Sequence, residues 1–188
     1  MSQPTHANLS LAKFVLKYLK GTIDKGLTFR GTERNEDIVG FCDADWAGSS
    51  DRKSISGYIY LHAGAISPVS WRSKKQATVA LSTCEAEYVS VSHAVQEAKF
   101  LRQLKSDLTG IEPRKILLQT DNKSAIELAK NPINHQRSKH IDIKHHFIRD
   151  EIKSETICLD YVPTDDNLAD VFTKPMSKFK LSKFNLCH

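Results

Sequence analysis

The stretch "GFCDADWAG", residues 40–48, places two aspartates at the end of a run that otherwise has the composition of a buried strand. Nearly all residues around Asp43 and Asp45 in the longer segment 38–46 are apolar. Burying a charged group is costly unless another group compensates it. Side chains alternate along a strand with period two, so Asp43 and Asp45 share one face. The stretch therefore predicts a strand whose end carries acids that need a partner.

Length and composition limit what the chain can be. Its 188 residues, 40% hydrophobic and 26% charged, fit one good-sized domain, or one domain with an appendage. No apolar run reaches the roughly 18 residues of a membrane span, and the N-terminus lacks the apolar stretch of a secretion signal. Four scattered cysteines predict free thiols in a reducing compartment. The net charge of +5 favours a polyanionic partner.

Hydrophobic periodicity and turn residues divide the chain into alternating elements. The predicted elements are a helix over 7–20, two strands within 26–46, β segments at 56–64 and 66–74 that form a hairpin, a helix over 83–108, a strand at 115–120, helices over 122–131 and 138–155, a strand at 156–163 and a short helix over 165–174. This order predicts an antiparallel meander followed by parallel strands, with helices packed on one mixed sheet.

A second acid, Asp121, directly follows the predicted strand at 115–120. Two predicted strands therefore deliver carboxylates at their C-terminal ends, where ligand sites of α/β sheets gather. Two bland interpretations stay open here: Asp121 also suits the N-cap of the next helix, and Asp45 also suits a turn residue that bonds its own backbone.

Two glutamates at the start of the helix over 83–108 are separated by their spacing. Ser82 and Glu85 form the pattern of a capping box, in which Glu85 has a structural role. Glu87 instead begins a stripe of small and apolar residues at helical spacing. The members of this stripe are Val91, Ala94, Ala98 and Leu101. Glu87 is therefore predicted to point toward the sheet.

Asp170 lies beside an apolar stripe in the last predicted helix, although alone it also suits an exposed helix residue. Two like charges about 4 Å apart repel by roughly 4 kcal/mol at an effective dielectric constant of about 20. Several acids in one place therefore require a cation. Ligand sets made only of oxygen suit Mg²⁺ or Mn²⁺, and two such ions about 4 Å apart promote phosphodiester cleavage.

Eight stretches between residues 11 and 176 resemble, in order, the ribonuclease H domain of copia-type LTR retrotransposon polyproteins. They are "YLKGTIDKGLTF", "GFCDADWAG", "SISGYIYL", "VSWRSKKQ", "STCEAEYVSVS", "LLQTDNKSAI", "KHIDIKHHFIRD" and "YVPTDDNLADVFTK". The resemblance implies an α/β, ribonuclease H-like fold with a five-stranded mixed sheet, strands one to three antiparallel, flanked by helices. It also implies three parts: residues 1–34, similar to the end of the reverse transcriptase connection, the ribonuclease H domain at 35–176, and a basic tail at 177–188.

The same resemblance implies an acidic quartet that is both catalytic and metal-binding, with two Mg²⁺ ions for which Mn²⁺ substitutes. Matched position by position, the quartet is Asp43, Glu87, Asp121 and Asp170. Asp45 and Glu85 are candidate neighbours of these ligands. Many relatives carry a catalytic histidine just after the fifth strand, and "YVPTDDN" has none. Whether one of the histidines in the segment 138–155 substitutes is left open; the candidates are His140, His145 and His146.

Basic and polar residues near the acids are candidates for contact with a nucleic acid. Three of them, in "WRSKKQ", are expected in the loop before the helix over 83–108, as a phosphate grip or as a solvated turn. The candidate substrate-binding residues are Arg72, Lys74, Lys75, Ser82, Thr83, Asn122 and His140. The histidines between 135 and 146 lack zinc-ligand spacing and accompanying cysteines, which favours a basic helix face near the substrate.

The expected function is a ribonuclease H: an endonuclease that hydrolyses the RNA strand of RNA/DNA hybrids by two-metal catalysis during reverse transcription, leaving 5′-phosphate products. The expected partners are the hybrid and the reverse transcriptase domain of the same polyprotein. The domain is expected to be a monomer in the cytoplasm, within virus-like particles, with no membrane contact. The alternatives are a DNA nuclease or strand-transfer domain of the same fold, or a non-catalytic nucleic-acid-binding domain of the connection type.

Overall fold

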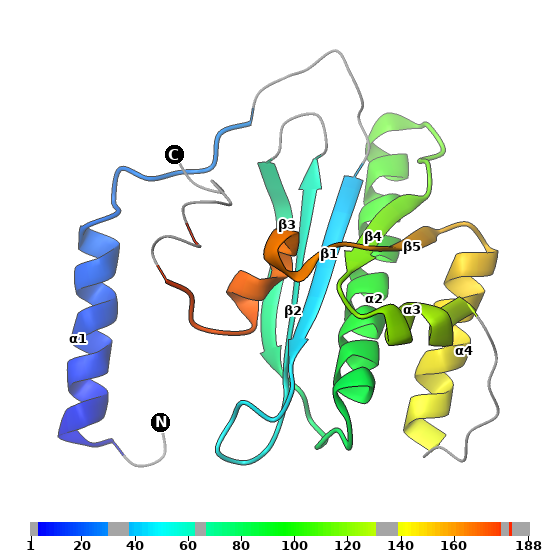
Figure 1. The fold of residues 1–188 in the computed structure, drawn as a ribbon. Helices are drawn as coiled ribbons and strands as arrows, with labels where there is room; N and C mark the ends of the chain where they lie inside the picture. Colours follow the sequence, from blue (N-terminus) through cyan, green and yellow to red (C-terminus); the bar gives the residue numbers. More distant parts are fainter. Residues whose placement is uncertain (1–3, 30–37, 63–66, 131–138, 178–180, 182–188) are drawn as a thin grey trace.

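The computed structural model describes residues 4–29, 38–62, 67–130, 139–177 and 181. Helices and strands alternate along the chain in nearly the predicted order (Figure 1). The elements are α1 (His6–Lys20), β1 (Ile38–Asp45), β2 (Ile55–His62), β3 (Ser67–Lys75), α2 (Thr83–Thr109), β4 (Ile116–Thr120), α3 (Lys123–Lys130), α4 (Lys139–Lys153), β5 (Ile157–Tyr161) and the 3₁₀ turns η1 (Thr164–Asp166) and η2 (Leu168–Phe172).

The five strands form one mixed sheet in the order β3-β2-β1-β4-β5. β1 pairs antiparallel with β2, and β2 antiparallel with β3. β4 runs parallel to both β1 and β5. The predicted mixed sheet with an antiparallel first half is therefore confirmed. It puts β1, which carries the quoted aspartates, at the centre.

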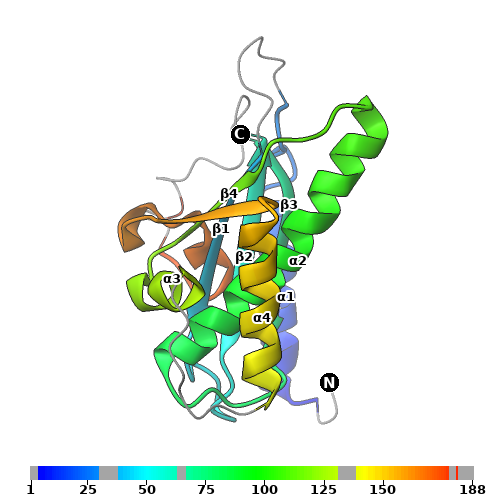
Figure 2. The same cartoon turned by 90° about the vertical axis from the view of Figure 1, so that its right-hand side faces the viewer.

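Helices α2, α3 and α4 cover one face of the sheet, and α2 and α4 lie side by side (Figure 2). The predicted stripe of α2 is buried in the core between them and the sheet. On the same face, the hydroxyl of Tyr60 donates to the Ala94 carbonyl at 2.5 Å. Gly40 makes this possible, because any Cβ at that position would overlap the Tyr60 ring.

The start of α2 follows the predicted capping box, except that the Glu85 carboxylate accepts from the N–H of Leu81 and not from that of the N-cap residue Ser82. The backbone N–H of Glu85 donates to Ser82 Oγ at 3.1 Å, and the Glu85 carboxylate accepts from the Leu81 N–H at 2.9 Å. Gly110 ends the helix in the left-handed conformation, with φ of 68°. Together these caps fix where along the sheet Glu87 enters the core.

Two predicted elements differ from the structure. Residues 26–29 form no strand, and the connection at 30–37 lies outside the described residues. The last predicted helix is instead the pair η1 and η2, because Asn167 between them is extended. Its side chain donates to the Cys42 carbonyl at 3.1 Å and accepts from the Ala169 N–H at 3.1 Å. The buried side-chain amide of Asn167 thus interrupts the predicted helix and bonds this segment to β1.

α1 differs from the other helices in having no buried residue. Its apolar side chains, among them Leu11, Phe14 and Leu16, are largely exposed. Within the described ranges, no helix is long and apolar enough to cross a membrane. Cys42, Cys84 and Cys158 are free thiols, as predicted.

Candidate active site

Three of the predicted acids gather at one point. Asp43 at the end of β1, Glu87 in α2 and Asp121 just after β4 each offer a carboxylate oxygen, and these oxygens lie within 4.8 Å of one another. Asp43 and Glu87 are buried, with 3% and 7% of their surface exposed, whereas Asp121 is half-buried. The grouping joins residues that lie up to 78 positions apart in sequence.

Sheet pairing and one buried serine bring the three together. β1 and β4 are parallel neighbours, so their C-terminal ends place Asp43 and Asp121 at the same edge. Ser90, one turn after Glu87, donates its hydroxyl to the main-chain carbonyl of Asp43 at 2.6 Å and also contacts that of Gly57 at 3.3 Å. This contact fixes the position of α2 along β1 and β2, so that Glu87 lies next to Asp43.

Asn122, not Asp121, caps α3. The side-chain oxygen of Asn122 accepts from the Ala125 N–H at 2.9 Å. The capping interpretation of Asp121 is therefore not needed, and its carboxylate lies with the other acids. Asn122, predicted as a substrate contact, has a structural role in this arrangement.

The surroundings of the acids disfavour their charged forms. Burial raises the pKa of Glu87 to about 9, and the charges of Asp43 and Asp121 add to this, against a hydrogen bond from the Ala44 backbone. Burial also raises the pKa of Asp43 to about 6, against the Thr173 hydrogen bond and the Lys174 charge. Among the described residues, no group donates to the buried Oε2 of Glu87.

This donor set fits a divalent cation. It consists of carboxylate oxygens only, it gathers like charges, and it leaves one buried oxygen with lone pairs to offer. A hard ion such as Mg²⁺ or Mn²⁺ takes oxygen ligands of this kind and offsets their repulsion.

The fourth acid, Asp170, reaches the site from η2 and is fully buried. It lies outside the group of three within 4.8 Å, and the residues that follow it connect it to Asp43. The hydroxyl of Thr173 donates to Asp43 Oδ2. Lys174 Nζ lies 2.7 Å from Asp170 Oδ1 and 4.0 Å from Asp43 Oδ2.

Gly57 makes room for this contact. It pairs with Asp43 across β1 and β2, on the face opposite the three core helices. A Cβ at Gly57 would lie 2.7 Å from Thr173 Cγ2 and 2.9 Å from Phe172 Cβ. Sequence reasoning missed Gly57, Thr173 and Lys174, although the spacing of four between Asp170 and Lys174 is a signal for an ion pair.

The two predicted neighbours of the ligands are occupied elsewhere. The Asp45 carboxylate fills the space that a Gly48 side chain would need, which favours its interpretation as a turn residue. Glu85 caps α2. Neither acid belongs to the group of three.

The basic residues of "WRSKKQ" lie in β3, so the prediction that they form a loop is wrong. The reason is that the ladder between β2 and β3 continues to the pair Ile55–Lys75. The side chains of Arg72, Lys74 and Lys75 are exposed, and Lys75 pairs with Asp51 at 3.1 Å. Ser82 and Thr83 are exposed at the start of α2, where Ser82 serves as the cap.

The histidines of α4 divide into different environments. His145 is buried and stacks on Tyr88, with ring centroids 4.0 Å apart, so it is a core residue. His146 is exposed and lies 3.7 Å from Asp142. His140 belongs to α4, but its side chain lies outside what the structure describes, as does all of His135.

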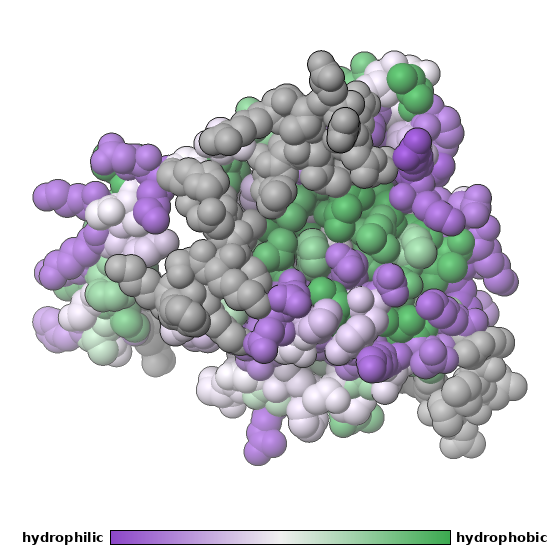
Figure 3. Space-filling view, turned by 45° about the horizontal axis from the view of Figure 1, so that its top comes forward, coloured by the Kyte–Doolittle hydropathy of each residue, from purple (hydrophilic) through white to green (hydrophobic). Residues whose placement is uncertain are grey.

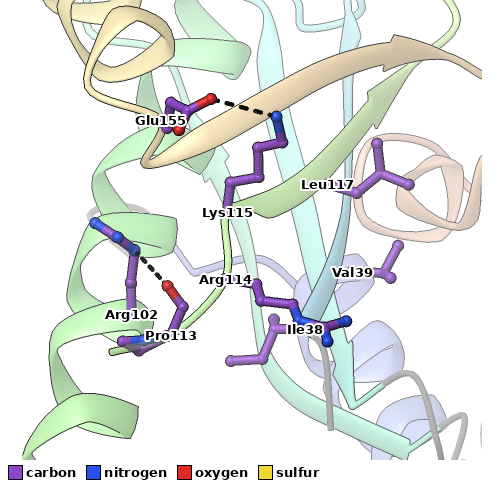
Figure 4. Close-up of a pocket in the computed structure, with 8 residues that line it drawn as sticks. All are labelled: Ile38, Val39, Arg102, Pro113, Arg114, Lys115, Leu117 and Glu155. Atoms are coloured by element: carbon purple, nitrogen blue, oxygen red, sulfur yellow. Dashed lines mark hydrogen bonds and ion pairs between the residues drawn. The ribbon is translucent and has the colours of Figure 1, made fainter. Parts of the chain in front are cut away.

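A pocket lies at the opposite ends of the acid-bearing strands. Ile38 and Val39 at the start of β1 and Leu117 at the start of β4 form its apolar part, and Lys115 pairs with Glu155 at 3.6 Å beside them (Figure 4). Figure 3 brings this end of the molecule forward and shows an apolar area bordered by polar side chains. None of the three grouped acids lines the pocket, so it is not the candidate reaction site.

Comparison with known proteins gives both a family and a fold, although no family model matches. The chain is 37% identical over 186 residues to the retrovirus-related Pol polyprotein from transposon TNT 1-94 of Nicotiana tabacum, covering 97% of this chain and 14% of that protein. It is 38% identical over 185 residues to that from transposon RE1 of Arabidopsis thaliana, covering 98% and 12%. It is also 30% identical over 184 residues to the transposon Ty1-LR3 Gag-Pol polyprotein of Saccharomyces cerevisiae, covering 95% and 10%. The chain thus spans 10% to 14% of the length of these three polyproteins.

Solved structures show the same fold at low identity. Ribonuclease H1 from Halobacterium salinarum matches with a TM-score of 0.54 at 14% identity, over 73% of this chain and 94% of that one. LC11-RNase H1 in complex with RNA/DNA hybrid matches with a TM-score of 0.54 at 11% identity, over the same shares of the two chains. The chain belongs to the family of copia/Ty1-type retrotransposon Pol polyproteins, of which it matches one region, and it has a ribonuclease H-like fold.

Proposed function

We propose that this domain is a metal-dependent endonuclease that hydrolyses the RNA strand of RNA/DNA hybrids during reverse transcription. The observation that carries the proposal is the meeting of Asp43, Glu87 and Asp121 within 4.8 Å at the end of the central strands. The buried Oε2 of Glu87, to which no group among the described residues donates, supports a cation at this point. A structure of the same fold holds an RNA/DNA hybrid, which supports this class of substrate.

Asp43, Glu87, Asp121 and Asp170 would hold two Mg²⁺ ions, or Mn²⁺ in their place. When bound, such ions supply Lewis-acid activation of water and stabilise the charge on the leaving oxygen. The chain itself positions the ligands: Thr173 orients one oxygen of Asp43 through its hydroxyl. Cleavage of this kind leaves a 5′-phosphate and a 3′-hydroxyl.

Recognition of the hybrid belongs to groups around the acids. Ser82 and Thr83 lie at the N-terminus of α2, which offers backbone donors and a favourable dipole to a phosphate or a 2′-hydroxyl. Because only the RNA strand carries 2′-hydroxyls, contacts to them select the strand. The exposed Arg72 and Lys74 on β3 add positive charge for the backbone of the nucleic acid.

The polyprotein family supplies the proposed context. The reverse transcriptase domain of the same polyprotein is the proposed partner, acting in the cytoplasm within virus-like particles, and the domain itself is monomeric. Residues 35–176 form the ribonuclease H domain in this proposal, preceded at 1–34 by the end of the connection and followed at 177–188 by a basic tail.

A cleavage assay tests the function. Labelled RNA/DNA hybrid, duplex DNA and single-stranded RNA are incubated with the chain in Mg²⁺ or in chelator. We expect cleavage of the hybrid alone, dependent on Mg²⁺ and lost in Asp43→Asn. Asp142→Asn, which changes an exposed carboxylate paired with His146, is the matched control and is expected to cleave normally. Cleavage of duplex DNA, or hybrid cleavage that survives Asp43→Asn, would overturn the proposal.

A further inference from the structure

The acid cluster already contains a cation of its own, the ammonium of Lys174. It lies 2.7 Å from Asp170 Oδ1 and 4.0 Å from Asp43 Oδ2, so that it bridges the fourth acid to the first. These two carboxylates are nearly or completely buried, whereas the Lys174 side chain is 40% exposed. The lysine therefore reaches from the surface to cover buried negative charge.

The lysine remains charged in this environment. Burial alone would lower the pKa of Lys174, but the hydrogen bond to Asp170 and the charges of Asp43 and Asp121 raise it overall. Its charge also acts on the rest of the cluster, since it lowers the pKa of Asp43 and of Glu87. Lys174 thus interacts with all four acids of the predicted quartet.

The position is fixed by the fold and not by chance proximity on the surface. Thr173 donates to Asp43 through its side chain and contacts the Asp170 carbonyl at 3.2 Å. The backbone N–H of Lys174 donates to the same Asp170 carbonyl at 3.3 Å. The turn that ends η2 therefore presents the Thr173 hydroxyl to the Asp43 carboxylate and the Lys174 ammonium to the carboxylates of Asp170 and Asp43.

We propose that Lys174 is a built-in counter-ion that holds the Asp43–Asp170 edge of the site in the metal-free chain and competes with a divalent cation for that edge. This inference rests on the proposed metal site. An ammonium and a divalent cation repel each other strongly at such distances when water is largely excluded. A cation that binds between Asp43 and Asp170 must therefore displace the lysine.

The lysine is suited to this exchange. Its four-carbon stem is flexible and its ammonium is readily hydrated. The side chain can therefore turn toward solvent when a divalent cation binds between Asp43 and Asp170. It is thus a positioning residue for the two acids that also sets how tightly the metal binds. Metal affinity at this edge then depends on a residue that is not itself a ligand.

Three variants separate this role from a purely structural one. Lys174→Met removes the charge and keeps most of the apolar stem, and Lys174→Arg keeps the charge. Lys99→Met is the matched control, because Lys99 is also an exposed lysine, 2.5 Å from the largely buried carboxylate of Glu151, away from the acid cluster. The measurements are Mn²⁺ and Mg²⁺ binding by calorimetry, and thermal unfolding with and without Mg²⁺.

We expect Lys174→Met to bind Mn²⁺ about tenfold more tightly than the wild-type chain, a change of roughly 1.4 kcal/mol. Its metal-free unfolding temperature falls, because buried carboxylates lose their counter-ion, and Mg²⁺ restores it. Lys174→Arg behaves like the wild type in both measurements. Lys99→Met also unfolds at a lower temperature, but its metal affinity is unchanged and Mg²⁺ gives it no larger gain than it gives the wild type.

Two results would overturn the inference, and they are distinguishable. In the first, the wild type binds metal and a folded Lys174→Met binds it equally or more weakly. This result would contradict the competition between Lys174 and the metal but would leave the metal site intact. Failure of the wild type and every variant to bind Mn²⁺ or Mg²⁺ would overturn the metal site itself, and the inference with it. If Lys174→Met does not fold without metal, the comparison of metal affinity is made with Lys174→Gln.

Discussion

Two glutamates on the same helix, Glu87 and Glu97, have opposite environments. Glu97 is half-buried, and both its oxygens are satisfied by the protein: Tyr58 donates at 3.1 Å and Ser70 at 2.7 Å. Glu87 is more deeply buried, faces two other carboxylates and has one oxygen to which no described residue donates. The first is an acid whose environment the fold completes by itself. The second is an acid that, in the proposed function, a cation completes.

This difference separates structural from functional acids more sharply than burial does. A buried carboxylate with donors stabilises the fold, whereas one without donors, gathered with like charges, costs stability. Glu151 belongs to the first kind, since Lys99 pairs with it at 2.5 Å. The least favourable buried charges lie where β1, α2 and β4 meet. Variants of Glu87 and Glu97 test this contrast between the two kinds of acid.

The largest expected effect is the difference in hybrid cleavage between Glu87→Gln and Glu97→Gln. We expect Glu87→Gln to lose hybrid cleavage by at least about a thousandfold, because metal-ion catalysis supplies several kcal/mol of barrier lowering. Its metal-free form is expected to be more stable than the wild type. Glu97→Gln should keep cleavage and lose stability by about 1 kcal/mol, since its hydrogen bonds are weakened. Equal effects of the two changes on cleavage would remove the distinction.

The second prediction concerns pH. The raised pKa values of Glu87, about 9, and Asp43, about 6, mean that the folded, metal-free chain holds more protons than the unfolded chain between the ordinary pKa values of these acids and pH 9. Stability is therefore greatest at low pH and falls as pH rises through these values. We expect the free energy of unfolding to fall by several kcal/mol between pH 5 and pH 9, because each unit by which a pKa is raised contributes about 1.36 kcal/mol.

Chemical denaturation in chelator measures this profile. Glu87→Gln should flatten the slope, and Glu97→Gln should leave it as in the wild type. Saturating Mg²⁺ should stabilise the chain more at pH 9 than at pH 5. An identical slope in the wild type and Glu87→Gln would show that Glu87 is not the group that titrates.

A smaller effect is expected for Thr173→Val, which removes the hydroxyl that donates to Asp43. Groups that orient metal ligands contribute about 10- to 100-fold to affinity or activity. We expect hybrid cleavage to fall about tenfold, with a higher Mg²⁺ concentration for half-maximal rate. Thr156→Val is the control, because Thr156 is also buried and bonds Ser154 at 3.0 Å just before β5, at the ends of β4 and β5 opposite to the acids. Equal Mg²⁺ dependence in both variants would contradict a role for Thr173 in orienting Asp43.

The smallest expected effect is on Asn122, the neighbour of Asp121. Asn122→Ala removes the cap of α3 and should destabilise the chain by about 1 kcal/mol. Thermal unfolding with and without Mg²⁺ measures this, and the gain from Mg²⁺ should equal that of the wild type. A reduced gain would mean that Asn122 contributes to the metal site as well.

Much of the site could be predicted because its acids interrupt regular patterns. Glu87 was found from the apolar stripe that it begins, and Asp43 from the cost of a charge in a buried strand. The sheet followed from the order of the β segments. Local periodicity contains this information, since it reports which face of an element is buried.

The remaining features depend on contacts between distant segments. The sequence could not show which residue caps α3, because Asp121 and Asn122 are adjacent and both residue types suit an N-cap. The predicted β segment at 66–74 already contained Arg72 and Lys74, and β3 confirms it; the separate expectation of a loop was wrong because polar residues at the edge of a sheet resemble a turn. Lys174 was missed because its contact with Asp43 requires η2 to pack on β2, where Gly57 leaves space for Thr173 and Phe172.

The hydrogen bond from Thr173 to Asp43 joins residues 130 positions apart. Closing so long a loop delays contact formation relative to the β2–β3 hairpin and the helices, whose contacts are local. The sheet can therefore assemble before the fourth acid arrives, since residues 164–174 follow its last strand, β5. A chain that ends before Leu168 would retain all five strands and the first three acids, yet lack Asp170, Thr173 and Lys174. The site is thus complete only when residues 164–174 pack against β1.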